Sequence, residues 1–181
     1  MNLSEEEKNI LIESAKKSIR SEFEDVEIVQ PDFEKYPDLK KNLGAFVTLK
    51  IDNQLRGCIG YLMGYKSLFE TIIEAAKQAA LNDTRFLPVS VDELEDIKVE
   101  ISVLSPFMPI KSYDEIVIGK HGLLLDEGGR AVLLPQVATE HKFNVPQFLK
   151  ALCQKAGLYG EYWKERMLNI KVFTADVFGE D

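Results

Sequence analysis

The feature that most constrains the fold is a pair of apolar, β-branched runs joined by residues that tolerate tight turns. The runs cover Ala45–Ile51 and Leu55–Gly60, and the tripeptide Asp-Asn-Gln stands between them. This arrangement is typical of a β-hairpin, whose two strands run antiparallel. The second strand reads LRGCIG, and its glycines predict a bend or a close approach of the backbone.

Two later segments also carry strand patterns. Between 98 and 104, valine and isoleucine alternate with polar residues, which predicts a half-buried strand with Glu100 on its second face. Further on, Glu-Gly-Gly separates two apolar runs and predicts a second hairpin. A strand or turn is expected near 116–118, and a last strand at 169–174.

Helices are predicted from capping residues and from apolar spacing. Ser4 with Glu7, and Ser67 with Glu70, form two capping boxes, in which each side chain satisfies a free N–H at the helix start. A third apolar helix face is expected before Gly157, a residue that suits a helix end. The three apolar faces comprise Leu11, Ala15, Ile19 and Phe23, then Leu68, Ile72, Ala76 and Ala80, then Phe148, Leu149, Leu152, Cys153 and Ala156.

Hairpins with interspersed helices predict an α+β fold with a mainly antiparallel sheet, rather than a doubly wound parallel one. A chain of 181 residues fits one domain, or one domain with a smaller lobe. The order hairpin, helix, strand occurs in both halves of the chain, which indicates a weak internal duplication.

Composition excludes several classes of protein. The net charge of −8 works against broad binding to a phosphate backbone, although it leaves room for a local basic site. Cys58 and Cys153 are far apart, which favours a reducing cytoplasm over a disulfide framework. No signal peptide is expected, and no apolar run reaches the roughly 20 residues that span a bilayer. No dinucleotide, P-loop, zinc-protease or EF-hand motif is present, so neither a metal site nor a particular cofactor is predicted.

The LRGCIG segment resembles the signature of the AMMECR family, and further matching segments follow in the family's order. The resemblance implies an α+β fold with a larger and a smaller lobe around a cleft, in a single AMMECR-type domain over 1–181. The further segments are NDTRFLPV at 82–89, VEISVLSP at 99–106, IGKHGLLL at 118–125, LLPQVATE at 133–140, KAGL at 155–158, and Trp163.

Bacterial and archaeal proteins of this kind resemble the first component of a three-part system, AmmeMemoRadiSam. The other components are a Memo-like protein and a radical S-adenosylmethionine enzyme. The resemblance therefore implies a cytoplasmic component of a metabolic or modification system with these two partners. It leaves the reaction, the substrate and any cofactor open.

Cys58 is the first candidate for a functional residue. Arg56 stands two positions before it, hence on the same face of a regular strand, where a guanidinium would favour the thiolate. Gly57 and Gly60 would let a ligand approach the backbone. The alternative is a small buried cysteine beside glycines that accommodate the curvature of the sheet.

His121, Asp83 and Arg85 are the next candidates. A Cys58–His121 pair would supply a nucleophile and its base, or His121 would be a hydrogen-bonded loop residue. Arg85 would clamp a carboxylate or phosphate through two parallel hydrogen bonds, or form an ion pair with Asp83 or Glu100 that fixes its loop.

Three further residues with acceptor groups are candidates for the functional site, and two other residues are expected to be structural. Glu100 would act as a general base or orient a ligand, unless it is a solvent-facing strand residue. Gln136 and Glu140, in a loop expected after Pro135, would line the cleft or cap local structure. Cys153 is predicted to lie in the core and His141 at the surface.

Three functions remain open at this point. In an enzyme, Cys58 would be the nucleophile or a thiol acid/base, His121 the proton carrier, and Arg56 with Arg85 the anion binders. In a non-catalytic module, the cleft would hold a substrate or a peptide for partner enzymes. RNA binding would need a local patch of Arg56, Arg85, Lys120 and Arg130, and no RNP-type aromatic motif supports it.

Overall fold

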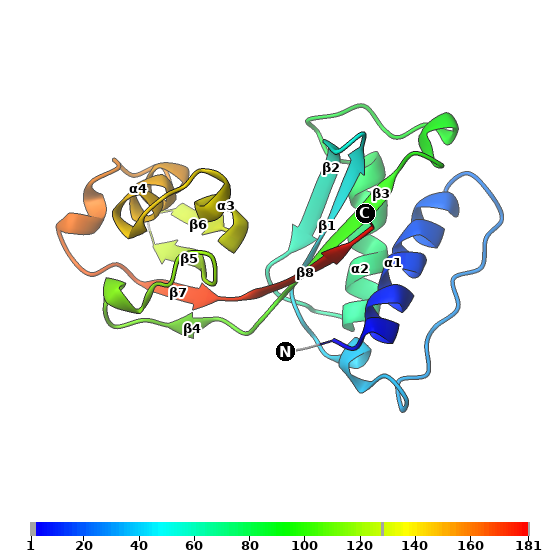
Figure 1. The fold of residues 1–181 in the computed structure, drawn as a ribbon, viewed down its shortest axis with the longest axis horizontal. Coiled ribbons are helices and arrows are strands. Elements are labelled where there is room, and N and C mark those ends of the chain that lie inside the picture. Colours follow the sequence, from blue (N-terminus) through cyan, green and yellow to red (C-terminus); the bar gives the residue numbers. More distant parts are fainter. Residues whose placement is uncertain (1–2, 128, 181) are drawn as a thin grey trace. The chain divides into compact units, whose positions relative to one another are not determined.

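The computed structural model describes residues 3–127 and 129–180. The chain forms two compact units (Figure 1). Unit 1 comprises Met1–Leu104 with Asp176–Asp181, and unit 2 comprises Ser105–Ala175. Each unit combines helices with its own four-stranded sheet, and the strand pairs described are antiparallel. The predicted α+β class is confirmed.

Unit 1 packs two helices on one face of its sheet. The strands lie in the order β2-β1-β3-β8. Figure 1 shows α1 and α2 side by side, and residues of both share one core with the sheet. The elements are α1 (Glu5–Arg20), η1 (Pro37–Lys40), β1 (Ala45–Ile51), β2 (Gln54–Tyr61), α2 (Leu68–Leu81), η2 (Val91–Glu93), β3 (Lys98–Leu104) and β8 (Ala175–Gly179).

The predicted local signals account for these elements. Both capping boxes are formed, by Ser4 with Glu7 and by Ser67 with Glu70. The apolar stripes behind them are buried, except for Phe23, which lies beyond the end of α1 and is exposed. Alternate residues of β1 and β3 complete the core. Their side chains lie on the face of the sheet that packs against α1 and α2 and is therefore buried.

Unit 2 repeats this architecture on a smaller scale. Its strands lie in the order β4-β7-β5-β6, and α3 and α4 contribute to its core. The segment after Pro135 was predicted as a loop, but it forms α3, because proline suits the first turn of a helix. The elements are β4 (Met108–Pro109), η3 (Tyr113–Glu115), β5 (Gly122–Glu127), β6 (Gly129–Leu133), α3 (Pro135–Glu140), α4 (Val145–Lys155), η4 (Tyr162–Lys164) and β7 (Ile170–Phe173).

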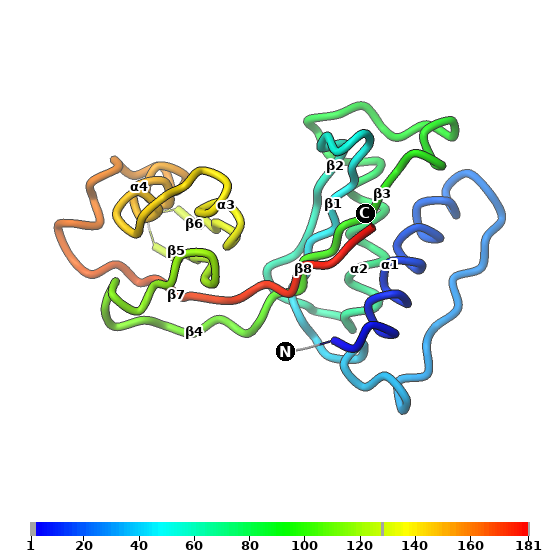
Figure 2. Tube along the Cα trace, viewed as in Figure 1, coloured from blue at the N-terminus to red at the C-terminus, as the bar shows by residue number. Residues whose placement is uncertain are grey.

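The two sheets have the same topology in three of their four strands, as the repeated sequence pattern predicted. In each, a hairpin is followed by helix, and the next strand returns beside the first strand of the hairpin. The orders β2-β1-β3 and β6-β5-β7 correspond. The fourth strands, β8 and β4, each follow directly after the third strand of the other unit, as the chain path in Figure 2 shows. These two strands are absent from the sequence prediction. β4 has only two residues, and β8 continues the run of β7 after one residue.

The first hairpin contains a β-bulge that sets the position of Cys58. Asp52 and Asn53 have φ values of 50° and 60°, the left-handed conformation of a tight two-residue hairpin turn. The pairing then slips between Leu49 and Lys50, so that Arg56 is the extra residue of β2. Beyond the bulge, Cys58 pairs with Thr48.

Gly57 is required where β2 crosses α2. A Cβ atom at this position would lie 2.2 Å from the carbonyl oxygen of Ala79. We expect Gly57→Ala to lower the free energy of unfolding by about 1–3 kcal/mol, because the strand and the helix must separate. Urea unfolding measures the change. Gly160→Ala is the control, since its new Cβ would meet only the flexible side chain of Lys150; equal losses would contradict the assignment.

Candidate functional site

Cys58 lies on the face of the unit 1 sheet opposite the helices. Residues paired across neighbouring strands point to the same face of a sheet. Cys58 pairs with Thr48, and Thr48 pairs with Glu100 on the other side. The adjacent pair Val47 and Ile101 belongs to the core beneath α1 and α2. Cys58, Thr48 and Glu100 therefore form one row on the other face.

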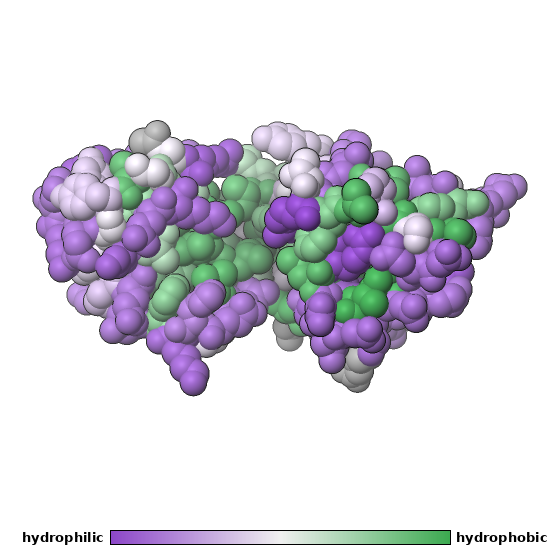
Figure 3. Space-filling model, turned by 90° about the horizontal axis from the view of Figure 1, so that it is seen from above, coloured by the Kyte–Doolittle hydropathy of each residue, from purple (hydrophilic) through white to green (hydrophobic). Residues whose placement is uncertain are grey.

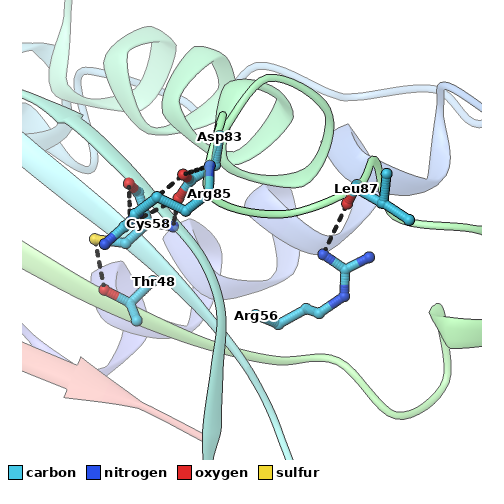
Figure 4. Close-up of polar contacts among 6 residues, drawn as sticks. All are labelled: Thr48, Arg56, Cys58, Asp83, Arg85 and Leu87. Carbon is cyan, nitrogen blue, oxygen red and sulfur yellow. Dashed lines mark hydrogen bonds and ion pairs between the residues drawn. The ribbon is translucent and has the colours of Figure 1, made fainter.

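Thr48 contacts the sulfur atom in this row. Its hydroxyl donates a hydrogen bond to Cys58 Sγ at 3.2 Å (Figure 4). A hydroxyl donor stabilises a negatively charged sulfur more than a neutral thiol. Thr48 was absent from the candidate residues, because its place opposite Cys58 depends on the bulge at Arg56.

The backbone of Cys58 is held on both sides by the loop that follows α2. β2 is an edge strand, so its outward N–H and C=O groups lack a strand partner. The Cys58 N–H donates to Asp83 Oδ2 at 2.8 Å, and Arg85 Nη2 donates to the Cys58 carbonyl at 3.3 Å. The Asp83–Arg85 loop thus completes the hydrogen bonding of the edge strand at the candidate residue.

Asp83 is a buried carboxylate that stays charged. Its side chain is only 5% exposed, and Arg85 donates to it from Nε at 2.9 Å and from Nη2 at 2.7 Å. These bonds, together with the Cys58 N–H, hold the pKa of Asp83 far below its ordinary value although burial opposes them. The ion pair that was the structural alternative for these residues is therefore present.

Arg85 is also the cation that the structure places near the sulfur. The hydrogen bonds that Arg85 donates to Asp83 are the main cause that raises the pKa of Arg85, and the nearby Cys58 adds to it. The Arg85 side chain is 55% exposed, and its Nη1 makes no hydrogen bond among the described residues. One edge of the guanidinium holds the loop, and the other edge is accessible to an anion.

Arg56 is directed elsewhere by the bulge. Its Nε and Nη2 donate to Glu93 at 2.6 and 3.0 Å, and its Nη1 donates to the carbonyl of Leu87 at 3.0 Å. Figure 4 shows that the contact between Arg56 and Leu87 lies away from Cys58. The predicted arrangement, with Arg56 beside Cys58 on one face of a regular strand, is wrong because the bulge interrupts the alternation.

The Arg56–Glu93 pair predicts an acid-dependent stability. Hydrogen bonds from Arg56, and then from the Ser90 N–H, lower the pKa of Glu93 from 4.5 to about 2. A lowered folded-state pKa stabilises the fold above about pH 4.5, and this contribution is lost as the pH falls towards 2. Glu93→Gln should therefore cost about 1–2 kcal/mol at pH 7 and progressively less below pH 4.5.

Urea unfolding at pH 7, 4 and 3 measures this dependence. The exposed Asp92→Asn is the control from the same short helix and should change little at any pH. A cost for Glu93→Gln that did not depend on pH would contradict the ion-pair account.

The other candidates of unit 1 also make contacts within the protein. Glu100 forms an ion pair with Lys50 at 2.7 Å. A Cβ atom at Gly60 would lie 2.4 Å from both the carbonyl oxygen of Ala45 and the ring of Phe46, so glycine permits this close contact with β1. Gly57 accommodates α2 in the same way.

The candidates of unit 2 lie at the ends of turns and helices. His121 Nδ1 accepts the N–H of Val117 at 3.2 Å, and the His121 N–H donates to the Val117 carbonyl at 2.9 Å. It is thus a hydrogen-bonded turn residue, and a Cys58–His121 pair, which would join the two units, stays a prediction. Gln136 and Glu140 lie near the start and at the end of α3.

Two residues of unit 2 behave as structural residues. His141 stacks on Phe143, with ring centroids 5.2 Å apart. Cys153 is completely buried in the core of unit 2, as predicted, and this burial raises the pKa of its thiol. It therefore provides an internal reference for Cys58, which is partly exposed.

The described residues hold no arrangement that suits a metal ion or a membrane crossing. Among them, no group of three or more His, Cys, Asp or Glu side chains converges. None of their helices combines the length and the apolarity that a bilayer crossing needs.

Comparison with known proteins identifies the family of the chain. Residues 12–178 match the AMMECR1 family model. The chain is 40% identical to Protein TV1384 of Thermoplasma volcanium over 158 residues, which cover 83% of this chain and 79% of that one. It is also 40% identical to Protein MK0488 of Methanopyrus kandleri over an alignment of 191 positions, which covers 99% of this chain and 91% of that one.

A solved structure agrees with this assignment. The crystal structure of the uncharacterised protein PH0010 from Pyrococcus horikoshii matches with a TM-score of 0.83 at 34% identity, covering 94% of this chain and 90% of that one. The chain belongs to the AMMECR1 family.

Proposed function

We propose that the chain is a cytoplasmic component of a metabolic or modification system, with Cys58 as its reactive group. The observation that carries the proposal is the surrounding of Cys58, whose sulfur accepts a hydrogen bond from Thr48 and whose backbone is fixed by Asp83 and Arg85. The proposed partners, a Memo-like protein and a radical S-adenosylmethionine enzyme, follow from the family resemblance.

The geometry of unit 1 suggests a role for each residue of the site. Cys58 Sγ would act as a nucleophile or as a thiol acid/base, with Thr48 stabilising its charged form. The free edge of Arg85 would bind an anionic group of the substrate. Glu100 lies in the same row two strands away, roughly 10 Å from Cys58 by the spacing of strands, and would accept a proton across a bound substrate. His121, in unit 2, is proposed as a second proton carrier from the sequence pattern alone.

A non-catalytic binding component is the second candidate. It is favoured by the contacts of Arg56, Asp83 and Glu100, which are each paired with a charged group of the protein. Such a component would hold a small molecule or a peptide for its partner enzymes. RNA is the weakest of these ligands, because the net charge is −8.

The test is a reconstituted mixture of the chain with its Memo-like and radical-enzyme partners. We expect Cys58→Ser to reduce the consumption of S-adenosylmethionine by at least about 100-fold, the scale for removal of a nucleophile or its acid/base group. Binding to the partners should be unchanged, and Cys153→Ala is the control. Full turnover with Cys58→Ser would reject a reactive role for Cys58 and leave the binding component.

A further inference from the structure

Unit 1 contains a pocket at the other end of β2 from the first hairpin turn. It has a volume of about 150 Å³. Tyr61, at the end of β2, pairs with Ala45 and so lies on the face of the sheet opposite to that of Cys58. The pocket is therefore separate from the Cys58 site. Its lining residues are Tyr61, Met63, Tyr65, Lys66, Thr71 and Glu74.

The pocket already holds an ammonium group. Lys66 Nζ donates to Glu74 Oε2 at 2.9 Å, and the hydroxyl of Tyr61 donates to Glu74 Oε1 at 3.2 Å. These hydrogen bonds, that of Lys66 first, keep the pKa of Glu74 below its ordinary value, so the carboxylate is charged at neutral pH. The site is thus built to attract a cation.

The ammonium of Lys66 is held weakly, while the apolar walls around it are uncovered. The Lys66 side chain is 59% exposed, and ion pairs this exposed contribute little. Tyr65 is 84% exposed and is one of the large side chains that reach the surface. On the face that Figure 3 draws, hydrophobic residues are also exposed among hydrophilic ones. Met63 is also exposed. An incoming cation can therefore displace the ammonium group of Lys66 and cover the side chains of Met63 and Tyr65.

The loop that carries Met63 and Tyr65 is held close to the neighbouring chain segment. A Cβ atom at Gly64 would lie 2.4 Å from the carbonyl oxygen of Leu43, so glycine permits this close contact of two backbones. The backbone between Met63 and Tyr65 is thereby fixed beside Leu43 before any ligand arrives.

We propose that this pocket binds an organic cation with a methylated ammonium head. A primary ammonium would only replace the hydrogen bond that Lys66 already makes with Glu74. Methyl groups on nitrogen would in addition contact the rings of Tyr61 and Tyr65 and the sulfur of Met63, and their charge would interact with the aromatic faces. This site does not depend on the function proposed for Cys58.

Choline is the probe that tests the proposal, with 3,3-dimethylbutan-1-ol as its neutral analogue of the same shape. Titration of the ¹⁵N-labelled full chain, followed by amide chemical shifts, gives the dissociation constants. We expect saturable shifts for choline around 61–74, and binding of the neutral analogue at least about tenfold weaker. The absence of saturable shifts with choline, or equal binding of the analogue, would overturn the proposal.

Three variants sharpen the test. Lys66→Ala should tighten choline binding severalfold, because it removes the competing ammonium. Tyr65→Ala should weaken it about tenfold, by loss of one aromatic face on an exposed residue whose removal leaves the core intact. Tyr159→Ala changes an exposed tyrosine of unit 2 and should have no effect. Weaker choline binding in Lys66→Ala would contradict the proposal. Unchanged choline binding in Tyr65→Ala would contradict it as well.

Discussion

Asp83→Asn is expected to lower the free energy of unfolding by about 2–4 kcal/mol at pH 7, the cost of breaking a buried charged pair that is accessible to solvent on one side. The carboxylate is almost completely buried and accepts hydrogen bonds from the backbone of Cys58 and from both the backbone and the side chain of Arg85. An amide retains one acceptor oxygen but places an NH₂ group against the donors of Arg85. Where the NH₂ group takes the place of Oδ2, the Cys58 N–H also loses its acceptor.

The pH dependence of this effect separates it from a packing defect. The folded-state pKa of Asp83 is lowered, so its contribution is complete above its ordinary range near pH 4 and is lost as the pH falls further. The cost of Asp83→Asn, followed by urea unfolding, should therefore shrink in acid. Asp126→Asn, at a loose surface pair with Arg130, is the control and should change little. A cost that persists in acid would refute the ion-pair explanation.

Thr48→Val is expected to slow the alkylation of Cys58 by about ten- to a hundredfold at neutral pH. Valine keeps the shape of threonine but removes the hydroxyl that donates to Cys58 Sγ, and a hydrogen bond to a charged group contributes about 1.5–3 kcal/mol. The rate follows from mass spectrometry of the Cys58 peptide after timed exposure to iodoacetamide.

Thr139→Val, which removes a hydroxyl from α3 of unit 2, is the control for this measurement. It should leave the rate at Cys58 unchanged. A Thr48→Val protein that reacts at the rate of the parent would show that this hydrogen bond does not support the charged sulfur.

The elements of the fold were predictable because each carries a local signal. Capping boxes, four-residue apolar spacing and turn residues all act within a few positions of one another. The first hairpin was predicted within one residue of its observed strands. α3 was missed because a helix of one and a half turns has too few residues to show an apolar period.

The site was less predictable because it depends on one irregular residue. In a regular hairpin with a two-residue turn after Ile51, Cys58 would oppose Val47 on the buried face. The bulge at Arg56 shifts the pairing by one, so that Cys58 opposes Thr48 instead. The same shift sends Arg56 to Glu93 and leaves Arg85 as the cation near the sulfur. Arg85 lies 27 positions from Cys58, and only the tertiary structure brings them together.

Competition between the two cysteines of the chain for an alkylating agent tests whether Cys58 is the reactive thiol that we propose. The native protein is exposed to limiting iodoacetamide at pH 7, and the labelling rates of the Cys58 and Cys153 peptides are compared. The account predicts that Cys58 reacts at least about 100-fold faster, because Cys153 is buried with a raised pKa. Equally slow labelling of both cysteines would contradict the claim and make Cys58 a structural residue.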